Sequence, residues 1–422
     1  MKRLLIYLIL LIIPYYSFSQ ANTYYISNNS NDMNSGKSPE QSWKTIKKII
    51  AGNTYLLKRN DVFYFTINKF NNPSNKKTTI GAYGQGNKPL ISLYKSINQD
   101  AWQPVSQNIW KVDLKNTNNY TGFLNNTDTN VGFLKANSEI RGAKLSSTSL
   151  LQKNWDFYSD KQYLYIYLPN NPSNLSSKVQ FVTNVNIIEL TNNMEVRDIA
   201  LTGTGEHAVS GVLCKDDTLR NLDITEIGGS YLIGVLRYGN GIQFWQGASD
   251  CLVEGCNVSQ VYDVAYTIQG VQAQSTFENI VFKNNKASNN EQSFEFWVKS
   301  PDGVFKNCFF INNYCTNAGY GWSYNVQPNK RSAVHLLAPM WNSGMSGLTI
   351  SNNTFISAKA GYIYLARTFP TTNAFKSFNN KISLDKNVPL RADNFYSFKV
   401  NDGANFSKAF NLDKSSEFKV TQ

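Results

Sequence analysis

Short runs of alternating apolar and polar residues fill this chain, and one kind of run recurs seven times between residues 194 and 384. Each copy joins an alternating segment to a small polar pair that is often Asn-Asn. Equivalent places in the copies are held by Arg197, Arg220, Glu254, Lys283, Lys306, Ser351 and Phe378, at steps of 23, 34, 29, 23, 45 and 27 residues. A short period stretched by insertions is typical of a solenoid.

Alternation is the pattern of a β-strand, and no copy contains the 3.6-residue spacing of an amphipathic helix. Strands that coil in one sense stack in parallel on the next turn, so the pattern predicts an all-β parallel β-helix. One column, predicted to face inward, contains Ile199, Leu222, Cys256, Asn285, Cys308, Asn353 and Asn380. Each asparagine can hydrogen-bond the amide of its neighbour, so we assign these residues to the coil and not to chemistry.

Residues 1–19 predict a cleaved secretory signal peptide. Lys2 and Arg3 precede an apolar run too short to span a bilayer well, and the small residues Ser17 and Ser19 precede the expected cut. No later stretch is apolar enough to cross a membrane. We therefore expect a secreted or periplasmic protein that is monomeric and has no membrane anchor.

The pattern of apolar and polar residues divides the rest of the chain into four segments. Residues 20–99 are assigned to an N-terminal cap and the first turns, with a capping helix from Ser38 to Ile50, because Pro39 follows a capping serine and an apolar stripe begins at Trp43. Residues 100–185 are aromatic-rich and alternate, which predicts an inserted antiparallel β-element. Residues 186–385 form the predicted β-helix, and residues 386–422 its C-terminal cap.

The opening of the chain resembles a known family. The segments that carry the resemblance are Tyr24-Tyr-Ile-Ser, Ser42-Trp-Lys-Thr-Ile, Leu56-Leu-Lys-Arg-Asn-Asp and Ile80-Gly-Ala-Tyr-Gly. They look like the start of secreted bacterial right-handed parallel β-helix proteins of the pectate-lyase-like superfamily, which include alginate and chondroitin lyases. The resemblance implies a right-handed coil and polysaccharide processing. It matches no catalytic motif of one family, so it assigns no catalytic residue.

The net charge and the cysteine content limit which binding partners and metals we expect for this protein. The net charge of +12 is dispersed and forms no Lys/Arg block, which argues against nucleic acid and suits an anionic polysaccharide. The five cysteines match no metal-ligand spacing, so we expect neither a disulfide framework nor a zinc site. We expect no cofactor, and calcium, which some similar lyases use, is the one metal left open.

The second strand of each repeat carries the candidate chemistry. Aligning the strands that begin at Gly241, Ala265, Ser293, Ala333 and Gly361 places apolar residues inward and polar residues outward. The alignment predicts that Glu295 stands beside His335, and that Asp263 and Glu291 stand beside Arg331 and Lys359. The remaining outward residues are Gln243, Thr267, Gln269, Trp245 and Trp297. Two insertions, residues 228–240 and 316–330, add Arg237, Tyr238, Tyr320 and Trp322 as candidate walls of a groove.

Three functions fit this patch, and we place the first slightly ahead. A lyase acting on uronates by β-elimination would use His335 as base, Arg331, Arg237 or Lys359 to hold the carboxylate, and Tyr238 or Tyr320 as acid. A glycoside hydrolase would pair two of Asp263, Glu291 and Glu295. A non-catalytic glycan-binding or surface protein would rely on its Trp and Tyr side chains, with Trp245 and Trp297 foremost. For either enzyme, Gln243 and Trp322 are further candidate substrate-binding residues. Singly, each polar residue could also be an ordinary solvated side chain.

Overall fold

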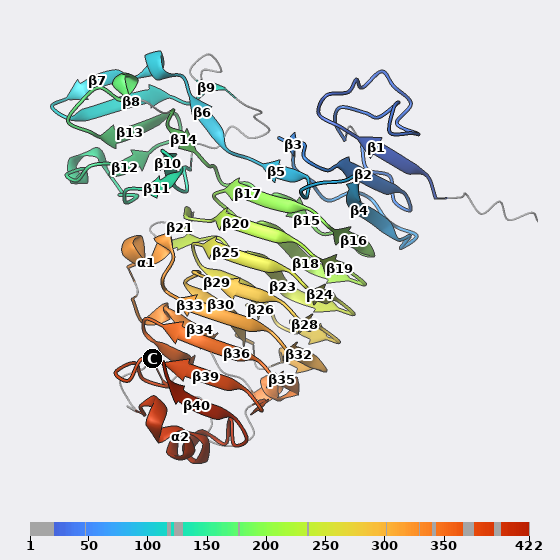
Figure 1. Cartoon of the computed structure of the whole chain (residues 1–422), viewed down its shortest axis with the longest axis vertical. Helices are drawn as coiled ribbons and strands as arrows, with labels where there is room; N and C mark the ends of the chain where they lie inside the picture. The colour runs from blue at the N-terminus through green and yellow to red at the C-terminus, as the bar shows by residue number, and fades with distance from the viewer. Residues whose placement is uncertain are drawn as a thin grey trace, which may run out of the picture.

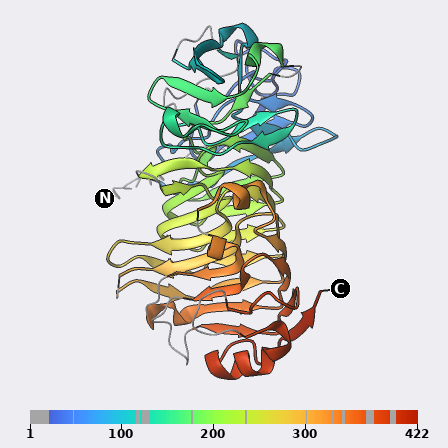
Figure 2. The ribbon, with the colours of Figure 1, turned by 90° about the vertical axis from the view of Figure 1, so that its left-hand side faces the viewer.

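The computed structural model describes residues 21–46, 48–115, 120–121, 130–175, 178–233, 236–300, 302–328, 330–339, 343–365, 375–391 and 398–421. Most described strands stack in parallel on successive turns of one coil, as Figures 1 and 2 show from two sides. The expected parallel β-helix is therefore confirmed. The predicted signal peptide, residues 1–19, lies outside the described residues. None of the described helices is long and apolar enough to span a bilayer.

Three parallel sheets form the sides of the coil, and in its regular part each turn adds one strand to each sheet. The first sheet contains β1 (Thr23–Ile26), β2 (Thr54–Lys58), β4 (Thr78–Tyr83), β16 (Met194–Arg197), β19 (Thr218–Arg220), β24 (Leu252–Glu254), β28 (Val281–Lys283), β32 (Cys308–Ile311), β35 (Leu348–Ser351) and β38 (Lys376–Phe378). The second contains β3 (Val62–Phe63), β5 (Leu90–Ser92), β17 (Ala200–Thr204), β20 (Asp223–Ile227), β25 (Asn257–Val261), β29 (Lys286–Ser288), β33 (Tyr314–Ala318), β36 (Thr354–Ala358), β39 (Lys381–Leu384) and β40 (Glu417–Val420).

The third sheet is the one that carries the candidate site. Its strands are β15 (Ile188–Glu189), β18 (Val209–Lys215), β23 (Ile242–Ser249), β26 (Val264–Gly270), β30 (Gln292–Val298), β34 (Val334–Ala338) and β37 (Gly361–Leu365), with the short strands β27 (Thr276–Glu278) and β31 (Val304–Lys306) at one side. A hairpin, β21 (Ser230–Ile233) and β22 (Leu236–Tyr238), leaves the coil between β20 and β23.

The recurring Asn-Asn pair explains how the chain turns between the first and second sheets. The first member adopts a left-handed conformation, as in Asn284 and Asn352, both with φ 57°. Asparagine tolerates this region better than most residues. The second member points inward and continues a ladder, in which the side-chain oxygens of Asn285, Asn313, Asn353 and Asn380 each accept the backbone N–H of the preceding turn at 2.8–2.9 Å.

One member of the predicted inward column was wrong. Asn313, and not Cys308, continues the asparagine ladder, because β32 rather than the segment around Lys306 pairs with β28. The segment around Lys306 forms β31, an extra strand that pairs with β27. Two similar alternating runs follow each other in this turn, and only one of them belongs to the first sheet.

The predicted N-terminal capping helix does not form in the described residues 38–46 and 48–50, which are turns and an isolated bridge. The amide of Gln41 does bond to Ser38, but the chain then becomes extended. Trp43 exchanges backbone hydrogen bonds with Tyr25 and Ser27, and its ring stacks on Tyr24 at 4.4 Å. An isolated bridge between Trp43 and Ile26, at the edge strand β1 of the first sheet, thus stands where the helix was expected.

The inserted element is antiparallel, as expected. It contains β6 (Lys95–Ile97), β7 (Gln103–Ser106), β8 (Ile109–Asp113), β9 (Tyr120–Thr121), β10 (Leu134–Ala136), β11 (Glu139–Arg141), β12 (Phe157–Ser159), β13 (Tyr163–Tyr167) and β14 (Gln180–Phe181). It has a hydrophobic core separate from that of the coil, built around residues such as Trp102 and Phe157. At the other end, α2 (Gly403–Phe410) packs Phe406 and Phe410 against the last turns.

Asn313→Ala tests the ladder. The change removes the acceptor for the Asn285 amide and the donor to the Phe282 carbonyl, both in the dry interior. We expect the free energy of unfolding to fall by about 2–4 kcal/mol, since each buried group left unpaired costs about 1–3 kcal/mol. Chemical denaturation measures this value. The matched control is Asn257→Ala, an exposed asparagine whose side chain bonds only Asp223, and it should change little. Equal effects at the two positions would contradict the ladder.

Candidate functional site

A cavity of about 620 Å³ lies on the outer face of the third sheet, beneath the β21–β22 hairpin. We call it the third-sheet cavity. It brings together residues from six stretches of the chain. Its lining includes Lys69, Asn186, Glu189, Glu206, His207, Ser210, Val212, Leu232, Leu236, Arg237, Tyr238, Asn240, Gln243, Trp245, Asp263, Gln269, Glu295 and Trp297.

The strand register supplies most of the floor. One outward column runs Glu189, Ser210, Gln243, Thr267 and Glu295 across neighbouring strands. A second column, two residues further along, runs Val212, Trp245, Gln269 and Trp297. The predicted order of Gln243, Thr267 and Glu295, and of Trp245, Gln269 and Trp297, is therefore correct. The two tryptophan rings meet edge to face at 5.9 Å.

Glu295 is a buried acid whose pKa is raised. Its side chain is 8% exposed, and its Oε1 accepts a hydrogen bond from Trp297 Nε1 at 2.8 Å. Burial raises the pKa of Glu295 to about 8, and the nearby Asp263 charge adds to the rise. Because Trp297 can only donate, a proton on this carboxyl group belongs on Oε2. At neutral pH Glu295 is therefore mostly a neutral proton donor in the wall of the cavity.

Asp263 precedes β26 and faces the same cavity. Burial raises the pKa of Asp263 to about 6, while a hydrogen bond from Gln292 opposes the rise. At neutral pH Asp263 is mostly ionised while Glu295 is mostly protonated. Two carboxyl groups whose environments separate their proton affinities are the usual basis of an acid–base pair.

His207 lies at the same cavity, one turn before Gln243, and its role is fixed by hydrogen bonds. Its Nδ1 accepts the backbone N–H of Asn240 at 2.9 Å, so the ring proton belongs on Nε2. This Nε2 lies 3.3 Å from Gln243 Nε2, which is also a donor because Gln243 Oε1 accepts from Asn240 Nδ2. Burial lowers the pKa of His207 to about 3. His207 is thus a neutral donor and a poor base.

Two predicted wall residues from the hairpin reach the cavity. Arg237 is 9% exposed, donates from Nε to the Gly229 carbonyl and from Nη2 to the Gly132 carbonyl, and stacks on Tyr262. Among the described residues no carboxylate forms an ion pair with it. Tyr238 donates its hydroxyl to Asn184 at 2.7 Å, and its ring meets that of His207 at 5.1 Å.

The prediction that His335 stands outward beside Glu295 is wrong. Leu337 pairs with Glu295, because the insertion before β34 shifts the register by two residues. His335 points into the coil, where it is 0% exposed, lies 3.0 Å from Ser293 Oγ and contacts Phe355. Burial lowers the pKa of His335 to about 3. The imidazole is a core residue and is not at the cavity.

The second predicted group forms only in part. Asp263 and Glu291 directly precede the paired residues Val264 and Gln292, and the Asp263 charge adds to the effect of burial in raising the pKa of Glu291. Glu291 is 0% exposed and accepts hydrogen bonds from Ser323, in α1 (Trp322–Val326), and Ser332. The side chain of Arg331 lies outside the described residues. Lys359 lies over the Tyr320 ring at 4.4 Å, and Trp322 donates its ring N–H to the Gln260 carbonyl. Lys359, Tyr320 and Trp322 are not among the lining residues of the cavity.

Sequence reasoning missed part of the cavity. Asn186 and Glu189 belong to the turn just before the regular repeats, Glu206 lies between β17 and β18 of the first repeat, and Lys69 comes from an early loop. The two-residue strand β15 is too short to show alternation, so the pattern gave no signal there. Among the described residues, the cavity holds no three His, Cys, Asp or Glu ligand atoms within 4.8 Å of one another, and calcium stays an untested expectation.

Comparison with known proteins gives only distant similarities. No protein-family model matches the chain, and no curated protein sequence matches it. The chain is similar to the structure of XylC with xylose, at 10% identity over 87% of this chain and 67% of that chain, with a TM-score of 0.50. It is also similar to the GH136 lacto-N-biosidase from Eubacterium ramulus, at 12% identity over 95% of this chain and 68% of that chain, with a TM-score of 0.44. A third similar structure is an alginate lyase from Paenibacillus sp. str. FPU-7, at 9% identity over 95% of this chain and 99% of that chain, with a TM-score of 0.33. At these identities the similarity concerns the fold alone.

Glu291→Gln tests the burial of this acid. Burial raises the pKa of Glu291 to about 7 from an ordinary value of 4.5, so the folded state favours the neutral form. Wild-type stability relative to the variant should therefore be highest below pH 4.5 and decline until about pH 7, by on the order of 3 kcal/mol. Denaturation at several pH values measures this difference.

The matched control for this test is Glu254→Gln. A hydrogen bond from Lys283 lowers the pKa of Glu254. The Glu254→Gln variant should therefore lose stability relative to wild type as the pH rises, which is the opposite trend to that of Glu291→Gln. A difference between Glu291→Gln and wild type that stays constant from pH 4 to pH 8 would contradict the assignment.

Proposed function

We propose that this protein is a carbohydrate-active enzyme that hydrolyses a glycosidic bond in the third-sheet cavity. Glu295 would serve as the acid and Asp263 as the base or nucleophile. The observation that carries the proposal is a pair of carboxyl groups at one cavity with different pKa values, about 8 for Glu295 and about 6 for Asp263. Glycoside hydrolysis needs one protonated and one ionised carboxyl group at the scissile bond.

The roles follow from the contacts of each group. Trp297 donates to Oε1 of Glu295, and Oε2, which the Gln269 amide approaches at a long 3.5 Å, is the oxygen that would protonate the leaving oxygen of the sugar. Asp263 can then activate water or attack the anomeric carbon. His207 cannot take either role easily, because its Nδ1 lone pair is already bonded to the Asn240 amide. It can instead donate Nε2–H toward a sugar hydroxyl.

The aromatic floor supports a sugar substrate. Trp245 and Trp297 lie on the outward column that crosses the cavity, and flat aromatic faces pack well against sugar rings. A solved structure of similar fold, XylC, holds xylose. The predicted export of the chain belongs to this proposal, since it would bring the enzyme to polysaccharides outside the cytoplasm.

The second candidate is β-elimination on a uronate polymer, the reaction favoured by the sequence. One observation supports it. Arg237 lines the cavity without a carboxylate partner among the described residues, and a substrate carboxylate could balance its charge. In this case Asp263 would remove the proton beside the carboxylate, and Tyr238 or Glu295 would protonate the leaving oxygen.

Product chemistry separates the two reactions. We would incubate the protein with neutral and acidic polysaccharides and follow reducing ends together with the ultraviolet absorbance of unsaturated ends. Hydrolysis gives reducing ends alone, and elimination gives both. Glu295→Gln and Asp263→Asn should each lower kcat by about 10²–10⁴-fold, the usual contribution of an acid or base. The matched control Glu254→Gln, on the outer face of the first sheet, should keep full activity.

The remaining outcomes are also informative. Activity that survives both substitutions would exclude Glu295 and Asp263 as the acid and base. Binding of one polysaccharide without any product, weakened by Trp245→Ala, would replace the enzyme with a glycan-binding protein.

The pH dependence gives an independent check. Activity should rise as Asp263 loses its proton near pH 6 and fall as Glu295 loses its proton near pH 8. The profile of kcat/KM should therefore be bell-shaped with a maximum near pH 7, its limbs reporting the apparent pKa values of the pair. A profile that is flat from pH 5 to pH 9 would contradict the assigned roles.

A further inference from the structure

A carboxylate interrupts an otherwise apolar column inside the coil. Asp217 precedes β19, at the position that Cys251 holds before β24 and Ile280 before β28. The side chain is 0% exposed. Its Oδ1 accepts the backbone N–H of Met194 at 2.8 Å. Its Oδ2 is buried and accepts no N–H or O–H donor among the described residues, and the weak thiol donor of Cys214 is the group that interacts with this carboxylate. An acceptor left without a partner in the core is costly, so its presence needs a physical cause.

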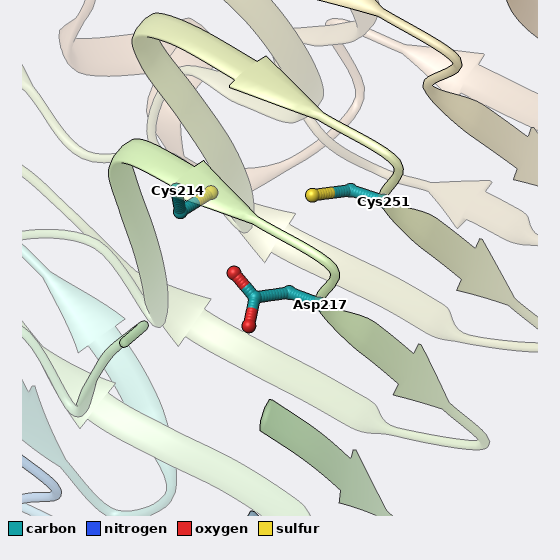
Figure 3. A group of neighbouring side chains, drawn as sticks. All are labelled: Cys214, Asp217 and Cys251. Carbon is teal, nitrogen blue, oxygen red and sulfur yellow. The ribbon is translucent and has the colours of Figure 1, made fainter. Parts of the chain in front are cut away.

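Two cysteine thiols lie against this carboxylate, as Figure 3 shows. The thiol of Cys251 donates to the Ser249 carbonyl at 3.2 Å. Cys214 is turned inward by an irregularity in β18 between Val212 and Cys214, where Leu213 adopts a φ of 53° and is left exposed. Such a bulge re-aims a side chain at a local cost. Both thiols are 3% exposed or less.

The three groups have the arrangement of a ligand set. One sulfur of each cysteine and one oxygen of Asp217 all lie within 4.8 Å of one another. Tetrahedral zinc binds sulfur at about 2.3 Å and carboxylate oxygen at about 2.0–2.2 Å, so small side-chain rotations would bring all three atoms to one ion. The Ser249 carbonyl, or a water molecule, can supply a fourth ligand.

We propose that Cys214, Asp217 and Cys251 form a buried site for a thiophilic divalent cation of the zinc type. Two thiolates favour such a cation over calcium or magnesium, which prefer oxygen ligands. The unpartnered Oδ2 of Asp217 would then gain its missing partner. The site is distinct from the third-sheet cavity, and it does not depend on the proposed enzymatic function.

Binding would exchange protons for the cation. Each coordinating thiol loses its proton, and two thiolates with one carboxylate carry three negative charges against two positive ones. Because all three side chains are enclosed, the cation would be captured as the chain folds, and it would join two successive turns of the coil.

The test uses the full chain produced in zinc-supplemented medium, desalted and analysed for zinc by elemental mass spectrometry. We expect about one zinc ion per chain, as for a closed structural site. Cys214→Ser and Asp217→Asn should each lower the affinity by more than about 100-fold, since even the loss of outer-shell partners costs 10–100-fold. The matched control is Cys308→Ser, a buried cysteine outside the group, which should keep its zinc.

Cobalt gives a readout that does not need the variants to fold. Wild-type protein produced with cobalt should show a near-ultraviolet thiolate-to-cobalt absorbance band, and prolonged chelation should remove the band and lower the melting midpoint. The proposal is overturned by wild-type protein without zinc, by equal zinc in wild type and in folded Cys214→Ser, or by a Cys214–Cys251 disulfide found by peptide mass spectrometry in freshly purified protein.

Discussion

The structure depends on the parallel pairing of each turn with the next, which sets neighbouring strands about 4.8 Å apart. This pairing converts a position in the sequence repeat into a column along the molecule. Inside, the columns must be apolar or must satisfy one another, as Asn313 and Asn353 do. Outside, the same register brings Gln243, Thr267 and Glu295 together although 52 residues separate the first from the last.

The same constraint explains how far the sequence alone could go. Alternation fixes which side chains face out, and it correctly placed Gln243, Glu295 and both tryptophans. It could not fix the register across an insertion, because a shift of two residues preserves the parity. His335 and Leu337 have the same parity in the strand, so the shift alone would leave His335 facing outward. It packs instead against Ser293 and Phe355 inside the coil, near the start of β34, where alternation does not hold. The extra strand β31 misled the repeat count in the same way, since it alternates like its neighbours.

Burial, more than charge pairing, sets the electrostatics of the third-sheet cavity. The chain carries a net charge of +12, yet desolvation is the first cause of the raised pKa of both Asp263 and Glu295. The sequence placed Lys359 beside Asp263 and Glu291, but Lys359 lies over the ring of Tyr320 instead. Because Glu295 is largely removed from water, its carboxyl group keeps its proton near neutral pH, which makes it a candidate acid.

The buried asparagines and the buried Asp217 differ in whether their polar atoms have hydrogen-bond partners, and this difference separates a structural role from a proposed ligand-binding role. Asn285 and Asn313 pair both their amide groups, so they need nothing beyond the coil. Asp217 instead leaves one oxygen unpaired beside two thiols whose sequence spacing shows no motif. In a coil, ligands from different turns meet through the register, so their separation in sequence depends on loop length and carries no metal signature. Such a group can therefore be recognised only from a missing partner in the folded core, where each unpaired polar atom requires a physical explanation.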